Sequence, residues 1–236
     1  MIDTILFDLD GTLLSMDTDE FIKNYFAALS VKLKDYFTPE EVVKYFWSST
    51  EYMINNVNPN KTNEEAFFED FYQYIDDVGE LNDVLDEFYK KDFNSIKGVS
   101  EVNKNIVESI KVLKAKGYDL VVATNPLFPL TAILNRIEWA GLDKEDFIFI
   151  TSFEEMHFCK PQIQYYSEIL DKINKNSTKC LMVGNDVEED MIAKEIGIDT
   201  YLIIDNIIGD LSDDKNIDHH GTYKDFYNFV LNLPII

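Results

Sequence analysis

The stretch FDLDGTLL, residues 7–14, follows directly on an apolar run near the start of the chain. That run favours a strand and Gly11 ends it, so residues 2–8 are predicted to form a buried strand. Asp8 and Asp10 are separated by one residue, and such residues point to the same side of an extended chain. The two carboxylates are therefore expected to face one ligand, with a plain Asp-Gly turn as the alternative.

Strand-like and helix-like patterns alternate along the second part of the chain. Short apolar runs predict strands at 118–124, 147–151, 179–184 and 200–204. Apolar residues three and four positions apart predict helices at 102–116, 130–140, 162–173, 190–196 and 223–233. Such alternation is typical of an α/β fold with right-handed crossovers. We therefore expect a Rossmann-like parallel sheet with helices on both faces.

Residues 17–91 carry a different pattern, in which apolar and aromatic residues recur every three or four positions. No strand pattern interrupts this stretch. We therefore predict an all-helical cap domain at 17–94, inserted into a catalytic core formed by 1–16 and 95–236. Most of its aromatic rings are expected to form its own core. The sequence cannot choose which rings face a ligand, and the candidates are Phe21, Trp47 and Tyr52.

The chain has 21 basic and 44 acidic residues, a formal net charge of −23. Such a charge repels nucleic-acid phosphates and anionic lipids, so we expect neither nucleic acid nor membrane as a partner. An anionic substrate would need local positive groups. There is no signal-peptide pattern and no apolar run long enough to span a bilayer, so a cytoplasmic location is expected. Cys159 and Cys180 are interpreted as reduced thiols, because no zinc-binding pattern accompanies them.

Two further motifs follow predicted strands. Thr124 and Asn125 lie where the strand at 118–124 ends. A hydroxyl, an amide and main-chain N–H groups at a helix start can hold phosphate, although helix capping explains the same residues. Lys160 precedes Pro161, which restricts it to an extended conformation. Its ammonium could neutralise carboxylates or phosphate at the sheet edge, and an exposed loop lysine is the alternative.

The last motif, GNDVEED at residues 184–190, follows another predicted strand. Asp186 and Asp190 are four residues apart and share one face if a helix begins here. Two carboxylates near a strand end suit a hard divalent cation such as Mg²⁺. The alternative is an acidic first helical turn stabilised by the helix dipole, to which we assign Glu188 and Glu189.

In this order, the four motifs resemble the signature of the haloacid dehalogenase-like superfamily. That signature is Asp-x-Asp-Gly-Thr, then a Ser or Thr, then a Lys, then an acidic motif of the Gly-Asp type. The resemblance covers about residues 1–16 and 95–236, and the predicted insertion matches the family's cap in position and type. It implies a Mg²⁺-dependent phosphatase that hydrolyses a small phosphorylated metabolite through an aspartyl-phosphate.

The resemblance also implies a nucleophile and a metal site. Asp8 would attack phosphorus, and Asp10 would protonate the leaving oxygen and then activate water. Mg²⁺ would lie between the Asp8 carboxylate, the Asp10 main-chain carbonyl and Asp186. The chain has Gly-Asn-Asp where Gly-Asp is commonest. We favour Asp186 as the ligand because of its partner Asp190, four residues on; if the register shifts by one, Asn185 becomes the ligand.

The remaining motif residues would serve the phosphoryl group. Lys160 and Thr124 would hold its oxygens, with Asn125 and nearby N–H groups helping. Asp190 would orient Lys160 or a metal-bound water. Mg²⁺ and Lys160 together would balance the negative charge of Asp8, Asp10, Asp186 and Asp190.

Alternative functions share parts of this pattern. Metal-independent 2-haloacid dehalogenases use the same nucleophile, but a halide needs no proton, so the acid at Asp10 favours a phosphatase. A phosphomutase shares all four motifs. A different class is a phospho-accepting receiver domain or a non-catalytic binding protein; the first is shorter and lacks the insertion, and the second should have lost a motif residue. The substrate is left open, and a monomer or weak homodimer is expected.

Overall fold

The computed structural model describes residues 1–75, 79–212 and 215–236, and its centre is a six-stranded sheet of order β5-β4-β1-β6-β7-β8. Every neighbouring pair in this sheet is parallel. The strands are β1 (Thr4–Phe7), β4 (Asp119–Val122), β5 (Phe149–Ile150), β6 (Cys180–Gly184), β7 (Asp199–Ile203) and β8 (His219–Gly221). The predicted α/β fold is therefore confirmed, and β1 lies inside the sheet.

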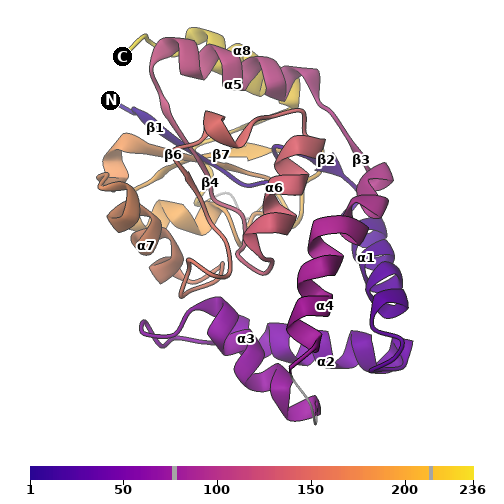
Figure 1. The fold of residues 1–236 in the computed structure, drawn as a ribbon. Helices are drawn as coiled ribbons and strands as arrows, with labels where there is room; N and C mark the ends of the chain where they lie inside the picture. Colours follow the sequence, from indigo (N-terminus) through magenta and orange to yellow (C-terminus); the bar gives the residue numbers. More distant parts are fainter. Residues whose placement is uncertain (76–78, 213–214) are drawn as a thin grey trace.

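Helices cover both faces of the sheet because successive strand residues point to opposite sides. Ile5 and Phe7 of β1 belong to a core shared with α5, α6 and α8, whereas Leu6 packs in a second core with α7. In Figure 1, α5 and α8 lie side by side at the top of the molecule. These helices are α5 (Lys104–Lys116), α6 (Leu130–Trp139), α7 (Ile163–Ile173) and α8 (Tyr223–Asn232).

Between β2 (Ser15–Met16) and β3 (Ser100–Glu101) the chain forms a helical block, residues 18–99, which lies below the sheet in Figure 1. Its α-helices are α1 (Thr18–Lys32), α2 (Pro39–Ile54), α3 (Asn63–Phe71) and α4 (Leu81–Glu87). Shorter helical segments follow at Tyr72–Tyr74, Phe88–Asp92 and Phe93–Val99. The exact domain boundaries at residues 17 and 94 stay a prediction.

Local sequence explains where two of these helices begin. Thr38 and Thr62 each accept a hydrogen bond from the backbone N–H three residues on, and a glutamate at that position bonds back to the threonine N–H. Such reciprocal caps satisfy N–H groups that a helix start leaves unpaired. Behind the caps, aromatic rings form the core of the block; for example, the ring centroids of Phe46 and Phe71 are 4.7 Å apart.

The helical block is attached to the sheet domain at separate places. β2 and β3 pair as a short antiparallel ribbon, which the sequence did not indicate. At the start of α3, Asn63 N donates to Met156 O at 2.8 Å and Glu64 N donates to Phe153 O at 2.9 Å. These main-chain bonds hold α3 against a loop that follows β5.

The structure corrects two local predictions. His219 and His220, where the sequence predicted no strand, belong to β8, which pairs with β7 at the sheet edge. A three-residue edge strand is too short for a period-two signal. The helix predicted at 190–196 is a 3₁₀ segment, Met191–Ile196, because a tight turn occupies residues 186–190.

Both cysteines are free and fully buried. Burial raises the pKa of both thiols, that of Cys180 to about 12. Because the thiolate is the reactive form, we expect a disulfide reagent to label the folded protein at least about 100-fold more slowly than the unfolded protein. The measurement is thiol release with and without denaturant. Rapid labelling of either thiol in the folded protein would contradict this burial.

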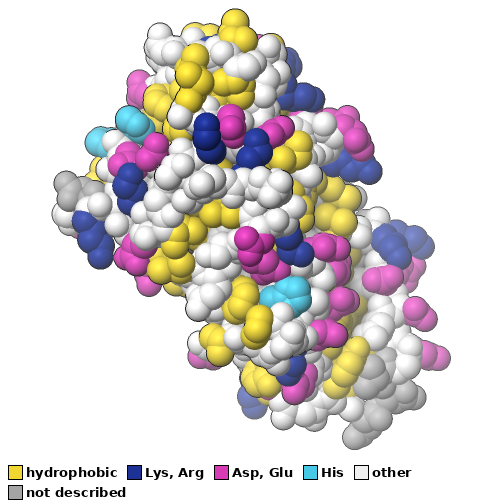
Figure 2. Space-filling model, turned by 90° about the vertical axis from the view of Figure 1, so that its left-hand side faces the viewer, with side chains coloured by type: hydrophobic (Ala, Val, Ile, Leu, Met, Phe, Trp, Pro, Cys, Tyr) yellow, Lys and Arg dark blue, Asp and Glu magenta, His cyan; other side chains and the backbone are white. Residues whose placement is uncertain are grey.

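Although acidic residues outnumber basic ones in the sequence, the surface is not uniformly acidic (Figure 2). On the face in Figure 2, lysine side chains lie among acidic ones and form no broad basic patch there. Within the described ranges, no helix combines the length and apolar character needed to cross a bilayer.

Candidate active site

A single buried lysine joins the ends of the central strands. Lys160 is 1% exposed, and its Nζ donates to Asp8 Oδ1 at 2.9 Å and to Asp190 Oδ1 at 2.6 Å. Burial disfavours its charge, but the carboxylates of Asp190 and Asp8 outweigh burial and raise the pKa of Lys160 well above its usual value. The structure thus brings together three predicted residues from distant parts of the sequence, with the lysine charged.

Asp190 also shapes the turn after β6. Its Oδ2 accepts the N–H groups of Asn185 and Asp186, both at 3.0 Å. A side chain at Gly184 would collide with this carboxylate, so the close approach requires glycine. Burial raises the pKa of Asp190, and Lys160 partly lowers it again. Asp190 is therefore placed to fix both Lys160 and the turn.

Asp10 has a partner that the sequence did not reveal. Its Oδ2 accepts a hydrogen bond from Nη1 of Arg136, a 1% exposed residue on α6 whose guanidinium lies 4.6 Å from the ring centre of Phe128. Asp10 Oδ1 is buried and has no hydrogen-bond partner among the described residues. Burial raises the pKa of Asp10 against the opposing effect of Arg136. Such a carboxyl can hold a proton and direct it at a ligand.

Arg136 is the only arginine of the sequence. It lies in the predicted helix at 130–140, on its apolar side, where a charge needs a buried partner. A lone arginine on the apolar side of a predicted helix indicates a buried acidic partner. The sequence could therefore have singled out Arg136, although it does not show which acid is the partner.

Asn125 lies beside Lys160, and Thr124 precedes it where β4 ends. The Asn125 amide donates to both carboxylate oxygens of Glu189 at 3.1 Å, and its Oδ1 accepts the Lys160 N–H at 3.2 Å. The Thr124 carbonyl accepts the hydroxyls of Thr151 and Tyr165, both at 2.8 Å, which fixes the main chain there. Glu189 lines the same cavity as these residues, and it lies in a tight turn before a 3₁₀ segment rather than in the predicted first turn of an α-helix.

Asn185 and Asp186 have different environments. The Asn185 side chain is engaged at both ends: Oδ1 accepts the Thr12 hydroxyl at 2.9 Å and Nδ2 donates to Asn206 O at 2.7 Å. Asp186 Oδ1 accepts the N–H groups of Glu188 and Glu189 at 2.8 and 2.9 Å, and Oδ2 accepts none among the described residues. Asp186 thus retains one carboxylate oxygen for a ligand.

The residues of the site can hold a hard cation, but they offer it few protein ligands. No group of three His, Cys, Asp or Glu side chains in the described part of the chain is arranged to hold a metal ion. The predicted Mg²⁺ site, however, needs only two carboxylates, Asp8 and Asp186, because its third protein ligand is the Asp10 main-chain carbonyl. Oxygen donors of this kind, completed by waters, suit Mg²⁺.

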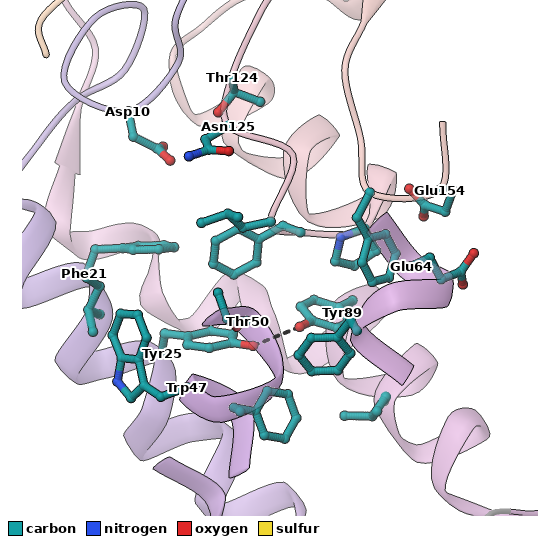
Figure 3. A pocket seen from close by; sticks show the side chains of 18 of the residues that line it. Asp10, Phe21, Tyr25, Trp47, Thr50, Glu64, Tyr89, Thr124, Asn125 and Glu154 are labelled. Carbon is teal, nitrogen blue, oxygen red and sulfur yellow. Dashed lines mark hydrogen bonds between the residues drawn. The ribbon is translucent and has the colours of Figure 1, made fainter. Parts of the chain in front are cut away.

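These residues form the floor of a cavity of about 880 Å³ between the sheet edge and the helical block. Of the three aromatic residues singled out from the sequence, Phe21 and Trp47 line the cavity and Tyr52 does not. In Figure 3, Asp10, Thr124 and Asn125 lie at one end, the rings of Phe21, Tyr25, Trp47 and Tyr89 lie opposite, and Glu64 and Glu154 lie at one side. The site is thus built by both parts of the chain.

Comparisons with known proteins agree with this architecture. The chain is 24% identical over 189 residues to the pyrophosphatase PpaX of Listeria welshimeri, which covers 80% of this chain and 76% of that protein. A HAD phosphatase from Thermococcus onnurineus has a TM-score of 0.63 at 17% identity, over 100% of both chains. The HAD-hydrolase YfnB from Bacillus subtilis, solved bound to magnesium, has a TM-score of 0.58 at 18% identity, over 98% of this chain and 99% of that one.

The structural likenesses, at such low identity, establish the shared fold. The family match extends further, because the model of the haloacid dehalogenase-like hydrolases matches residues 5–203. That range begins in β1 and ends in β7, so it contains all four motifs and the helical block. The predicted resemblance is therefore confirmed: this chain is a member of the haloacid dehalogenase-like hydrolase family.

Proposed function

We propose that the chain is a Mg²⁺-dependent phosphatase that hydrolyses a small phosphorylated metabolite through an aspartyl-phosphate on Asp8. The observation that carries the proposal is the ammonium of Lys160 between Asp8 and Asp190, at 2.9 and 2.6 Å. It holds the nucleophile in one orientation and offers positive charge where a phosphoryl group would bind. The pyrophosphatase name of the relative from Listeria welshimeri gives further support.

In the first step, a carboxylate oxygen of Asp8 attacks phosphorus. Lys160 binds Oδ1, so Oδ2 is the oxygen available for attack. The bond from phosphorus to the leaving oxygen breaks as the bond to Asp8 forms, and Asp10 gives that oxygen its proton. The raised pKa of Asp10 and its unpartnered Oδ1 suit this donor role.

In the second step, water replaces Asp8 on phosphorus. Asp10, now ionised, takes a proton from that water, and inorganic phosphate leaves with the Asp8 carboxylate restored. Arg136 stabilises the ionised form of Asp10 between the two steps. Thr124, Asn125 and Lys160 would hold the phosphoryl oxygens throughout, which keeps attack in line.

A bound Mg²⁺, held by Asp8, Asp186 and the Asp10 carbonyl, would supply charge neutralisation for the phosphoryl group. Without it, the acids of the site would repel a phosphate dianion, because Lys160 is already shared between Asp8 and Asp190. Asp190 would position Lys160, and Asn185 would support the turn through Thr12.

The acid at Asp10 favours this function over metal-independent dehalogenation, since a halide leaves without a proton. Phosphomutase activity uses the same residues and differs in the acceptor of the phosphoryl group. A cytoplasmic location, the absence of nucleic-acid and membrane partners, and a monomer or weak homodimer stay predictions from the sequence.

Chelation tests the cation requirement. Excess EDTA is expected to lower phosphate release from a phosphate monoester by at least about 100-fold, because the carboxylates then face the substrate without a counter-ion. Adding Mg²⁺ beyond the chelator should restore the rate. The measurement is colorimetric phosphate release, and undiminished turnover in excess chelator would refute the requirement.

A further inference from the structure

We propose that the substrate of this site has an apolar, ring-bearing leaving group without negative charge, so that small diacidic phosphates are poor substrates. The inference rests on the proposed phosphatase function and defines its substrate class. It follows from the walls of the cavity above Asp8 and Asp10, not from the residues that would perform the chemistry.

Aromatic side chains dominate the wall opposite the carboxylates. Those that line the cavity are Phe21, Tyr25, Phe26, Phe46, Trp47, Phe67, Phe68, Tyr72, Tyr89, Phe128 and Phe153. The hydroxyls of Tyr25 and Tyr89 bond to each other at 2.8 Å, as Figure 3 shows, so these tyrosines present ring surface to the cavity. Rings at such positions bind an apolar or aromatic group by stacking and by excluding water.

The charged residues on the wall are all acidic. Among the described residues that line the cavity, none is Lys, Arg or His. Its acids outside the catalytic floor are Glu64, Glu65, Glu69, Asp83, Asp86 and Glu154. The two cations that balance members of this set, Lys61 on Glu69 and Lys90 on Asp86, do not themselves line the cavity. A second phosphate or a carboxylate on the substrate would therefore meet no cation.

Among the acids of the wall, Glu64 opposes an anionic leaving group most directly. It is partly buried, and its carboxylate has no hydrogen-bond or ion-pair partner among the described residues. Glu154 lies near it in Figure 3 and spends both oxygens on the N–H of Leu130, at 3.0 Å. A carboxylate left in this position disfavours an anionic leaving group and accepts a neutral or cationic one.

The shape of the cavity places the ring relative to the reaction. Asp10 and Thr124 lie at one end of the view in Figure 3, the rings of Tyr25 and Tyr89 lie opposite, and Glu64 lies at one side. A phosphoryl group on Asp8 would therefore leave its ester oxygen facing the rings. The leaving group has about 880 Å³ of cavity in which to lie, far more than a glycolate or a phosphate requires.

Three matched esters test this inference: benzyl phosphate, 4-(aminomethyl)benzyl phosphate and 4-carboxybenzyl phosphate. They share the reacting oxygen and the ring and differ in charge at the far end. We expect kcat/KM for the carboxylate to be at least about tenfold below that of the other two. Ethyl phosphate should also be about tenfold below benzyl phosphate, because it lacks the ring. Equal or better turnover of the carboxylate or of ethyl phosphate would overturn the inference.

Two pairs of variants locate the effect. Trp47→Ala should lower the benzyl-to-ethyl ratio of kcat/KM several-fold, whereas Tyr52→Ala, an exposed ring on the same helix outside the cavity, should leave the ratio unchanged. Glu64→Gln should reduce discrimination against the carboxylate ester, and Glu145→Gln, on an exposed turn away from the site, should not. Ratios that are the same in both members of each pair would contradict the assigned walls.

The outcome separates this inference from the function on which it rests. Turnover of pyrophosphate or phosphoglycolate with poor turnover of benzyl phosphate would refute the substrate class and leave a phosphatase. Absence of phosphate release from every ester in the presence of Mg²⁺ would refute the phosphatase itself, and the substrate class with it.

Discussion

Asp8→Asn is expected to lower kcat for phosphate release by about 10⁴-fold or more, the largest catalytic effect that the site predicts. The amide is a poor nucleophile, and it also removes one of the two carboxylates on Lys160. Asp190 remains to neutralise the lysine, at 2.6 Å, so the fold should survive. The measurement is single-turnover phosphate release at saturating substrate and Mg²⁺.

A matched control separates loss of the nucleophile from loss of an acid elsewhere. Asp171→Asn, at an exposed position of α7, makes the same chemical change away from the cavity and should retain wild-type kcat. Circular dichroism and thermal unfolding of both variants report whether each is folded. Folded Asp8→Asn with wild-type turnover would mean that another residue attacks phosphorus.

Arg136→Met is expected to cause the largest loss of stability, about 3–5 kcal/mol in the free energy of unfolding. The substitution leaves the partly buried Asp10 carboxylate without its cation and removes the guanidinium from the ring of Phe128. Methionine fills much of the space, so the loss comes mainly from the unpaired charge rather than from a cavity. Urea unfolding, with its midpoint and slope, measures the change.

A second substitution tests this reason. In Arg136→Met combined with Asp10→Asn, no charge is left unpaired, so most of the lost stability should return although the salt bridge is absent. Lys111→Met, which breaks an exposed ion pair with Glu108, should change stability little. A loss below about 1 kcal/mol in Arg136→Met, or no recovery in the double variant, would contradict a buried ion pair at this site.

Elements that are specified by neighbouring residues could be predicted from the sequence, whereas elements that depend on residues far along the chain could not. β1, β4 and β6 are apolar runs, and the helical block has a clear three-to-four period, so local pattern was sufficient. The sequence predicted a helix from residue 190, but whether the turn after Gly184 continues as an α-helix is decided by the two N–H groups on the Asp190 carboxylate. The β8 edge strand depends on pairing with β7, which local pattern does not contain.

The site residues that follow parallel strands could be predicted, because such strands end at one edge of the sheet. The hydrogen-bond partners of individual side chains could not be predicted in the same way. Asp8 and Lys160 meet because parallel strands bring their carboxyl ends together. The pair of Asp10 with Arg136 and the bond of Asn125 to Glu189 join residues 126 and 64 positions apart. Such pairings depend on how α6 and the turn after β6 pack, which no periodicity in the sequence specifies.

The ribbon of β2 and β3 has a mechanical consequence. The chain passes between the sheet domain and the helical block only twice within the described residues, and both passages run through these paired strands, with Ser15 opposite Glu101. If the block moves away from the sheet domain, we expect it to rotate about this ribbon. The main-chain bonds from Asn63 and Glu64 to the loop after β5 would have to break during that rotation. Such a movement would carry the rings of the block, such as Tyr25 and Trp47, away from the carboxylates, while Phe128 and Phe153 would stay with the sheet domain. Product exit and water entry would then use the same opening.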